Sequence, residues 1–190
     1  MEIPEIEQQI KQMTKEPRFL HSKGVQQTAR MLAERYGADP EKASLAGLMH
    51  DAVKNLPFAE MFRLCEEFGC ELDSVTKNEP KLIHAPLGAY YAKFVFGIDD
   101  DEIFDAIYYH TTAKADMPLL TKIIYIADVI EPNRNFDGVE DLRKAAFEDI
   151  DAAILQAIDF NICKIVHSGR MLHDETVNAR NYLIEKGVRI

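Results

Sequence analysis

The chain has 190 residues, of which 47% are hydrophobic and 28% are charged, and its formal net charge is −10. This length is enough for one domain with a substantial core, and we expect residues 1–190 to form a single domain. The acidic balance argues against a general nucleic-acid-binding protein, which normally carries a basic face, but it leaves small phosphorylated ligands open.

Apolar residues recur at helical spacing along nearly the whole chain, and no run of strict alternation predicts a strand. A short helix is expected around residues 6–13. The next helix opens at Pro17 and stops at Gly37. Asp39-Pro40, an N-cap followed by a first-turn proline, opens a third helix that runs to His50-Asp51.

The remaining apolar stripes are helical as well. A fourth helix follows the break at Asn55-Leu56-Pro57 and ends at Gly69, and the polar residues 70–80 are expected to form a loop or short turns. Further helices are expected at about residues 84–95, 103–110, 118–131, 150–166 and 174–187. The pattern predicts a compact all-α fold.

His50 and Asp51 place an imidazole and a carboxylate side by side at the end of a helical run of small residues. Neighbouring residues on a regular helix point about 100° apart, so one site could use both only where the helix ends. We therefore expect the pair in the last turn. Metal ions that accept nitrogen and oxygen ligands would use such a pair.

Other candidate ligands lie on the apolar sides of other predicted helices. His21, His84 and His110 each follow a different apolar stripe, and Asp128 continues the stripe of residues 120–124 at steps of four. A single core histidine is more often a hydrogen-bonded structural residue than a ligand. An unpaired carboxylate in the core is costly, however, and a cation would relieve that cost. Their coincidence favours a metal centre drawn from several helices.

Five segments carry a resemblance that covers nearly the whole chain. They resemble the YqeK family of bacterial symmetrical dinucleoside-tetraphosphate hydrolases, within the HD-domain phosphohydrolase superfamily. The resemblance implies an HD-domain helical bundle. One departure is Ala113, where the family usually has glycine. The segments are residues 18–22, 46–54, 84–90, 106–112 and 122–134.

By that resemblance, four residues would bind the metal: His21, His50, Asp51 and Asp128. Iron is the expected ion, with manganese, cobalt or zinc as alternatives, because imidazole and carboxylate ligands without thiolates suit these ions better than magnesium. His84 and His110 would contact phosphate, although a second metal ion at these residues stays open. The residues expected to be catalytic are Asp51, His84, His110 and Lys54.

The resemblance also implies a set of substrate contacts. Arg18, Lys54 and Arg134 are the nearby cations that would match a tetraphosphate. The turn that opens the last helix would contact the nucleotide through free N–H groups, although Asp174 is equally well explained as an ordinary N-cap. The expected substrate-binding residues are Arg18, His21, Asp51, His84, His110, Thr111, Asp128, Arg134, His173, Asp174, Glu175, Thr176, Val177 and Asn178.

The expected reaction is the hydrolysis of diadenosine tetraphosphate into two ADP by metal-activated water. The alternatives are a nucleotidase or deoxynucleotide triphosphohydrolase with the same metal site, and a catalytically silent nucleotide-binding regulator. Three cysteines without metal spacing, no apolar run of about 20 residues and no signal-peptide pattern lead us to expect a reduced, cytoplasmic setting. We expect no nucleic-acid or membrane partner, and a homodimer is possible.

Overall fold

The computed structural model describes residues 3–190, in which eleven α-helices and one 3-10 turn occur and no residue is in a strand. The all-α prediction is confirmed. Met1 and Glu2, which begin the segment expected to lack a signal peptide, lie outside the described residues. The helices are α1 (Ile3–Met13), α2 (Glu16–Tyr36), α3 (Pro40–Met49), α4 (Phe58–Phe68), α5 (Ser74–Asn78), α6 (His84–Phe94), α7 (Asp101–Tyr108), α8 (Leu119–Ile130), α9 (Val139–Glu148), α10 (Ile150–His167) and α11 (Asp174–Glu185).

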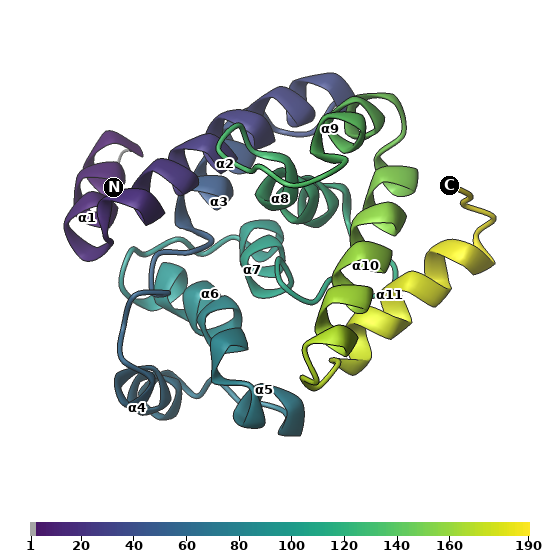
Figure 1. Cartoon of the computed structure of the whole chain (residues 1–190). Coiled ribbons are helices and arrows are strands. Elements are labelled where there is room, and N and C mark those ends of the chain that lie inside the picture. Colours follow the sequence, from purple (N-terminus) through teal and green to yellow (C-terminus); the bar gives the residue numbers. More distant parts are fainter. Residues whose placement is uncertain (1–2) are drawn as a thin grey trace.

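The core is built around α8. Ile123, Ile124, Ile126 and Ala127 are all fully buried, so this helix is apolar around most of its circumference, as expected for a central helix. It packs against α2, α3, α7, α9 and α10. Figure 1 shows α7 and α8 in the middle of the molecule, with α2 along one edge and the α10–α11 pair along the other.

Several helix boundaries follow directly from local chemistry. α2 stops at Gly37, which has the left-handed φ of 76° that glycine adopts at little cost. Asp39 then caps α3, because its side chain accepts hydrogen bonds from the backbone N–H groups of Glu41 and Lys42. These two boundaries agree with the expectations from the sequence, and they fix the point at which α3 enters the core.

Three stretches differ from the expectations, and one of them is α9, a helix that no expected range covers. Residues 70–80 contain the short helix α5, which forms because Asp73 accepts hydrogen bonds from the backbone N–H and the hydroxyl of Thr76. α7 ends at Tyr108 and does not carry His110, contrary to the expected helix at residues 103–110. The chain leaves the helix there and reaches Ala113, which has a φ of 59°. The final turn of the expected helix is thus replaced by irregular backbone.

The close contact between α2 and α3 depends on Gly47. A Cβ atom at this position would lie 3.0 Å from Cα and 3.1 Å from N of Gln26, and 3.1 Å from the carbonyl oxygen of Val25. These are backbone atoms, so the helix would have to move. We expect Gly47→Ala to lower the free energy of unfolding by about 1–3 kcal/mol. Urea denaturation measures this, and an unchanged unfolding midpoint would contradict it.

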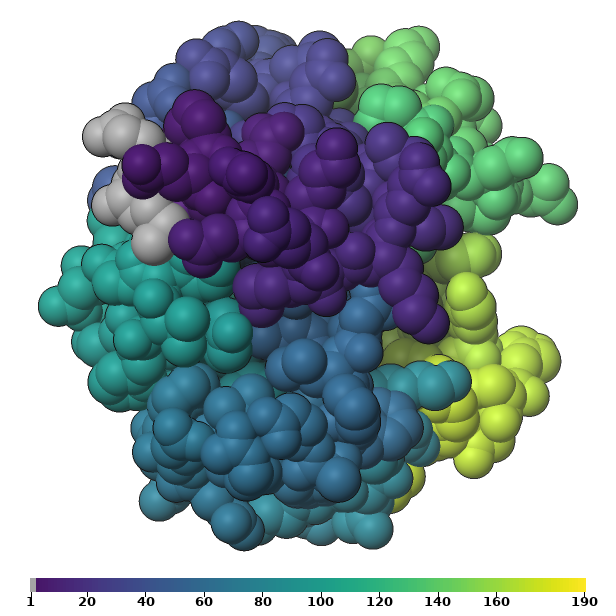
Figure 2. All heavy atoms as spheres, turned by 90° about the vertical axis from the view of Figure 1, so that its left-hand side faces the viewer, coloured from purple at the N-terminus to yellow at the C-terminus, as the bar shows by residue number. Residues whose placement is uncertain are grey.

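Two surface properties complete the description. None of the described helices is both long and apolar enough to cross a membrane. The surface is hollowed where the N-terminal helices, drawn in purple, meet the blue segment and the yellow C-terminal segment (Figure 2).

Candidate metal centre

Four histidines and two aspartates from five parts of the chain meet at one buried point. His21 lies in the second turn of α2, His84 begins α6, and His110 follows α7. Three groups of these side chains have ligand atoms within 4.8 Å of one another. The groups are His21, His50 and Asp51; His50, His110 and Asp128; and Asp51, His84 and His110.

His50 and Asp51 serve the same point because they follow the last residue of α3. The backbone N–H of His50 still donates to the carbonyl of Ala46, but the next bonds are three-residue turns, from Ala52 to Met49 and from Lys54 to Asp51. This tighter winding turns the second side chain inward, and the His50 Nε2 to Asp51 Oδ2 distance is 3.4 Å. The pair therefore lies in the turn at the helix end, as expected.

Asp51 is the centre of the cluster and joins two pairs of histidines. Its Oδ2 atom lies 3.6 Å from His21 Nε2 and 3.4 Å from His50 Nε2. Its Oδ1 atom lies 3.1 Å from His84 Nε2 and 3.5 Å from His110 Nε2. The carboxylate is fully buried, and its Oδ1 atom accepts no well-formed hydrogen bond within the described chain. Such a buried oxygen needs a cation or a proton nearby, and the ammonium group of Lys54 lies 3.1 Å from it.

Asp128 completes the first pair. It lies in the last turn of α8, and its Oδ1 atom is 3.0 Å from His21 Nε2 and 3.8 Å from His50 Nε2. The carboxylate of Asp128 therefore points inward, as the spacing of the apolar stripe predicted. His50 and His110 also contact each other edge to face, with ring centroids 4.9 Å apart, so the two pairs form one cluster.

The tautomers of the histidines follow from their second nitrogen atoms. The Nδ1 atoms of His50, His84 and His110 lie 2.6–2.7 Å from the backbone carbonyls of Gly47, Lys81 and Ile107. A carbonyl oxygen only accepts, so each Nδ1 carries the hydrogen and each neutral ring presents a lone pair at Nε2.

These lone pairs face one another. The two Nε2 atoms of His21 and His50 are 3.2 Å apart, and those of His84 and His110 are 3.1 Å apart. Ligand atoms about 2.0–2.2 Å from a metal ion lie about 3 Å from one another, which matches these separations. Imidazole nitrogens and carboxylate oxygens without thiolates suit iron, manganese or zinc. The residues present therefore fit a divalent metal ion.

The charges in the cluster are held in the forms that bind metal. Burial disfavours the charged form of Asp51, but the neighbouring histidines and the charge of Lys54 outweigh it and keep its pKa well below the usual value. Burial likewise opposes the charge of Asp128, and His21, His50 and Arg134 together hold its pKa well below the usual value. Burial lowers the pKa of His84 to about 4, so its ring is neutral at pH 7.

Three cations surround the two carboxylates. Arg18 Nη1 lies 2.5 Å from Asp51 Oδ2, and Lys54 Nζ lies 3.1 Å from Asp51 Oδ1. Arg134 Nη2 lies 2.5 Å from Asp128 Oδ1. Each of these side chains is partly exposed, so its charged end is accessible to a ligand as well as to the carboxylates. The structure thus brings all three cations expected from the sequence to the cluster.

Glu131 is a residue of the cluster that sequence reasoning missed. It is 1% exposed, and its Oε1 atom lies 3.0 Å from Nδ1 of His21. Its Oε2 atom accepts hydrogen bonds from the backbone N–H and the side-chain amide of Asn133. A carboxylate behind a ligand histidine fixes the tautomer and orientation of the ring. Its position within residues 122–134, a segment that carries the family resemblance, was the signal in the sequence, but its place directly after α8 is also typical of an ordinary helix end.

Gly24 makes room for this carboxylate. A Cβ atom on Gly24 would lie 2.2 Å from Oε2 and 3.1 Å from Cδ of Glu131. The contact explains the need for glycine inside α2, where this residue otherwise weakens a helix.

The expected nucleotide contacts lie beside the cluster, around two cavities. One cavity of about 370 Å³ is lined by Lys54, His110, Asp128, Thr111 and Thr176 together with residues of α10. Thr111 also lines a second cavity of about 210 Å³ with His173 and Glu175. Asp174, Val177 and Asn178 line neither cavity.

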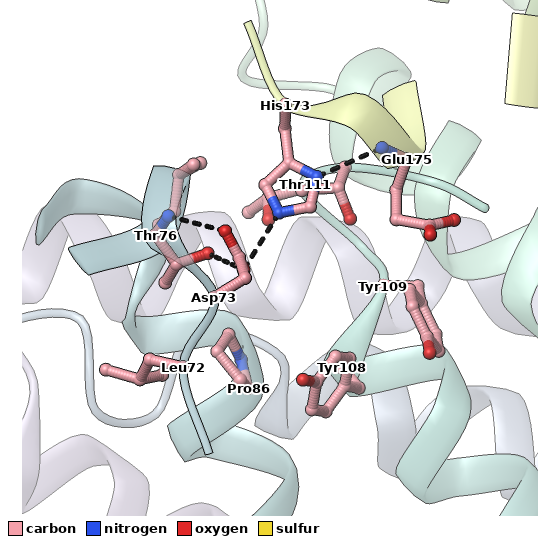
Figure 3. Close-up of a pocket in the computed structure, with 11 residues that line it drawn as sticks. Leu72, Asp73, Thr76, Pro86, Tyr108, Tyr109, Thr111, His173 and Glu175 are labelled. Atoms are coloured by element: carbon pink, nitrogen blue, oxygen red, sulfur yellow. Dashed lines mark hydrogen bonds and ion pairs between the residues drawn. The ribbon is translucent and has the colours of Figure 1, made fainter. Parts of the chain in front are cut away.

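The second cavity has an apolar floor and a polar rim (Figure 3). Leu72, Pro86, Tyr108 and Tyr109 line it. On the rim, Nε2 of His173 lies 3.1 Å from Asp73 Oδ2, while its Nδ1 atom accepts from the backbone N–H of Glu175. Both ring nitrogens therefore have protein partners, and the ring face is the part of His173 left for a ligand.

Asp73 links α5 to the start of α11, and this link is expected to be lost in acid. Burial opposes its charge, but hydrogen bonds from Thr76 and the neighbouring His173 lower its pKa. Because the folded-state pKa is lowered, the stabilisation is present above the unfolded value of about 4 and disappears as the pH falls through the folded value. Asp73 is half exposed, so we expect Asp73→Asn to cost less than about 1 kcal/mol, or roughly 1–3 °C.

Melting curves of the wild type and Asp73→Asn between pH 6 and pH 2 test this. The difference in melting temperature should shrink toward zero at the acid end. A difference that stays constant over this range would contradict the assignment.

Comparison with known proteins agrees with the geometry. The model of the HD domain family matches residues 18–133, so the fold and the His–Asp cluster define an HD-domain protein. A symmetrical bis(5'-nucleosyl)-tetraphosphatase of Bacillus subtilis is 39% identical over 92% of this chain and 94% of its own length. A protein of the same name from Staphylococcus aureus is 31% identical over 96% of this chain and 94% of its own length.

A solved structure is also similar. It is a predicted HD superfamily hydrolase from Clostridium acetobutylicum, described as involved in NAD metabolism, with 44% identity, a TM-score of 0.95 and 98% coverage of both chains. The chain belongs to the YqeK family of HD-domain proteins, whose similar members are named symmetrical bis(5'-nucleosyl)-tetraphosphatases.

Proposed function

We propose that this protein is a metal-dependent hydrolase that splits diadenosine tetraphosphate between its two central phosphates and releases two ADP. The observation that carries the proposal is the convergence of imidazole lone pairs and buried carboxylates beside three cations, in a chain similar to named tetraphosphatases. Residues 1–190 would act as one domain. The fit to a nucleotide substrate comes from the cavities beside the cluster.

The metal ligands in this proposal are His21, His50, Asp51 and Asp128, and iron is the proposed ion. When bound, such an ion lowers the pKa of a water molecule and neutralises charge on the attacked phosphate. The carboxylates of Asp51 and Asp128 are already ionised at neutral pH, so they accept hydrogen bonds and orient a water molecule without first losing a proton.

His84 and His110 contribute acceptors on the other side of Asp51. Their Nε2 atoms carry lone pairs at neutral pH and so accept a hydrogen bond from the attacking water or from a protonated phosphate oxygen. A second metal ion, if bound, would be held by Asp51, His84 and His110 through the same lone pairs. Metal analysis separates these roles, because two ions per chain would favour the second ion.

Arg18, Lys54 and Arg134 would hold the tetraphosphate. Phosphoryl transfer depends mainly on position and on neutralisation of charge, and a positively charged fork binds phosphate oxygens in a fixed geometry. In the reaction, water oxygen bonds to phosphorus, the phosphorus–oxygen bond between the central phosphates breaks, and the second ADP leaves as an anion. The water proton passes to an acceptor of the cluster.

The nucleoside of the first half would extend toward Thr111 and the start of α11. The cavity between them has an apolar floor with Tyr108 and Tyr109, which suits a base, while the polar rim suits ribose hydroxyl groups (Figure 3). Thr176, at the start of α11, is a further proposed contact, although the backbone N–H groups of Glu175 and Thr176 already donate to His173.

Product analysis tests the proposal. Protein reconstituted without oxygen with Fe²⁺, and separately with Mn²⁺, Co²⁺ or Zn²⁺, is incubated with diadenosine tetraphosphate, and the products are separated by ion-exchange chromatography. Two ADP per substrate is the expected result. ATP with AMP, or nucleoside with inorganic phosphate from mononucleotides, would favour a different hydrolase, and tight binding without turnover with every metal would favour a silent regulator.

A further inference from the structure

We propose that a third cavity, beside the start of α2, binds the second nucleotide half of the substrate. It is lined by Lys15, Pro17, Arg18, His21, Asn55, Glu131, Asn133 and Arg134 and has a volume of about 430 Å³. The inference deepens the proposed function, because it names where the second ADP is held before and after the bond is cleaved. It assigns Lys15, Asn55 and Asn133 to substrate binding.

The position of this cavity is the first argument. It reaches the metal centre at His21, whereas the cavity near α10 reaches it at His110 and Asp128, and the two cavities share no lining residue. They therefore approach the cluster from different sides. A dinucleoside tetraphosphate cut in the middle must extend an ADP-sized half away from the cleavage point in each of two directions.

The charges of the lining are the second argument. Three of its side chains are cations: Lys15, Arg18 and Arg134. Its one acidic side chain, Glu131, is buried and has both oxygens engaged by His21 and Asn133. In a chain with a net charge of −10, a cavity of this composition selects anions. Phosphate groups are the anions that the neighbouring metal centre is built to receive.

Lys15 is the cation of this cavity that is left for a ligand. Arg18 and Arg134 pair with Asp51 and Asp128, whereas no ion pair among residues 3–190 involves Lys15. Its side chain is exposed at the edge of the cavity. An ammonium group there binds the phosphate that lies farther from the metal centre, where neither arginine is needed.

Two amides supply hydrogen bonds of opposite kinds. Asn55 accepts from the backbone N–H of Lys15 through Oδ1, so its amide nitrogen still has hydrogens to donate. Asn133 donates through Nδ2 to Glu131, so its own oxygen still accepts. Ribose hydroxyl groups both donate and accept, and this pair of amides matches them. The ligand of the cavity is therefore a nucleoside diphosphate group.

The test counts the ADP molecules that the metal-reconstituted protein binds, by isothermal titration calorimetry. The wild type is expected to bind two ADP per chain and Lys15→Glu only one. Lys144→Glu makes the same charge change at a lysine that is 77% exposed on α9, and it should still bind two. One ADP per chain in the wild type, or two in Lys15→Glu, overturns the proposal.

Kinetics provide an independent readout. Lys15→Glu should lower kcat/KM for diadenosine tetraphosphate roughly 10- to 100-fold, as expected for losing one charge-assisted contact and adding repulsion, while Lys144→Glu leaves it unchanged. Equal kcat/KM values in all three proteins would contradict the inference. Product analysis of the wild type is independent of both measurements. If the wild type binds two ADP per chain but releases other products from the substrate, only the proposed reaction is refuted.

Discussion

Replacing Asp51 with asparagine is expected to lower kcat/KM for diadenosine tetraphosphate by a factor on the order of 1,000 or more, which corresponds to about 4 kcal/mol of transition-state stabilisation. The reason is the position of this carboxylate between the two histidine pairs, 3.1–3.6 Å from all four Nε2 atoms. An amide lacks the charge that a metal ion requires and would turn hydrogen atoms toward one pair of rings.

Metal binding gives a second measurement on the same variant. A ligand that binds only the folded state stabilises it by about 2.7 kcal/mol at 100 times its Kd, or roughly 5–10 °C for a chain of this size. The wild type should show such a rise in melting temperature with Mn²⁺ or Fe²⁺. Asp51→Asn should show little or none, while circular dichroism confirms that it is folded.

A matched control separates loss of the site from loss of charge. Asp159→Asn makes the same chemical change at a carboxylate that pairs with Arg180 between α10 and α11. It should keep the activity and the metal-induced rise of the wild type. If Asp51→Asn keeps full activity, or if metal raises its melting temperature as much as that of the wild type, Asp51 is not part of the mechanism. The description of the fold would not be affected.

Removing the carboxylate behind His21 is expected to have the second-largest effect. Glu131→Ala leaves Nδ1 of His21 without its acceptor and frees the ring to rotate, so we expect a 10- to 100-fold loss of metal affinity. Glu131→Gln keeps an oxygen that can accept from His21 and should lie between Glu131→Ala and the wild type. In both variants, activity should be closer to that of the wild type at saturating metal than at limiting metal.

Gly24→Ala tests the same role without altering the carboxylate. The added methyl group would lie 2.2 Å from Oε2 of Glu131 and displace it from Asn133 and His21. We expect reduced metal affinity similar to that of Glu131→Ala. Glu140→Ala, which removes a glutamate that is 81% exposed, is the control.

The outcome that contradicts the positioning role is specific. If Gly24→Ala and Glu131→Ala bind metal as tightly as the wild type and still lose activity at saturating metal, Glu131 acts on the substrate and not through His21. Metal affinity is measured from the dependence of the melting temperature on metal concentration, which does not require turnover.

Much of the architecture could be predicted because it is encoded locally. The end of α2 at Gly37, the cap at Asp39 and the apolar stripe of α8 each depend on residues within a few positions of one another. The inward direction of Asp128 follows from the same stripe. α7 is the counter-example, because its helical period continues to His110 whereas the backbone leaves the helix after Tyr108.

The tautomers of the histidines and the identity of their partners could not be predicted. Glu131 contacts His21 across 110 positions of sequence, and Asp73 contacts His173 across 100. The residues next to Glu131 and Asp73 in the sequence do not indicate which distant histidine each one contacts. The cavity lined by Lys15 could not be predicted either, because it forms only where the start of α2 approaches the turn after α8.

The sequence by itself determined which side chains could serve as ligands and that helices would carry or closely flank them, because residue type and helical period are local properties. The tertiary structure alone decided that Asp51 lies between two histidine pairs, that Glu131 orients His21, and that a basic cavity opens on the far side of the cluster. The physical reason is that these contacts depend on how α2, α6, α7 and α8 pack together, and packing is a property of the whole core.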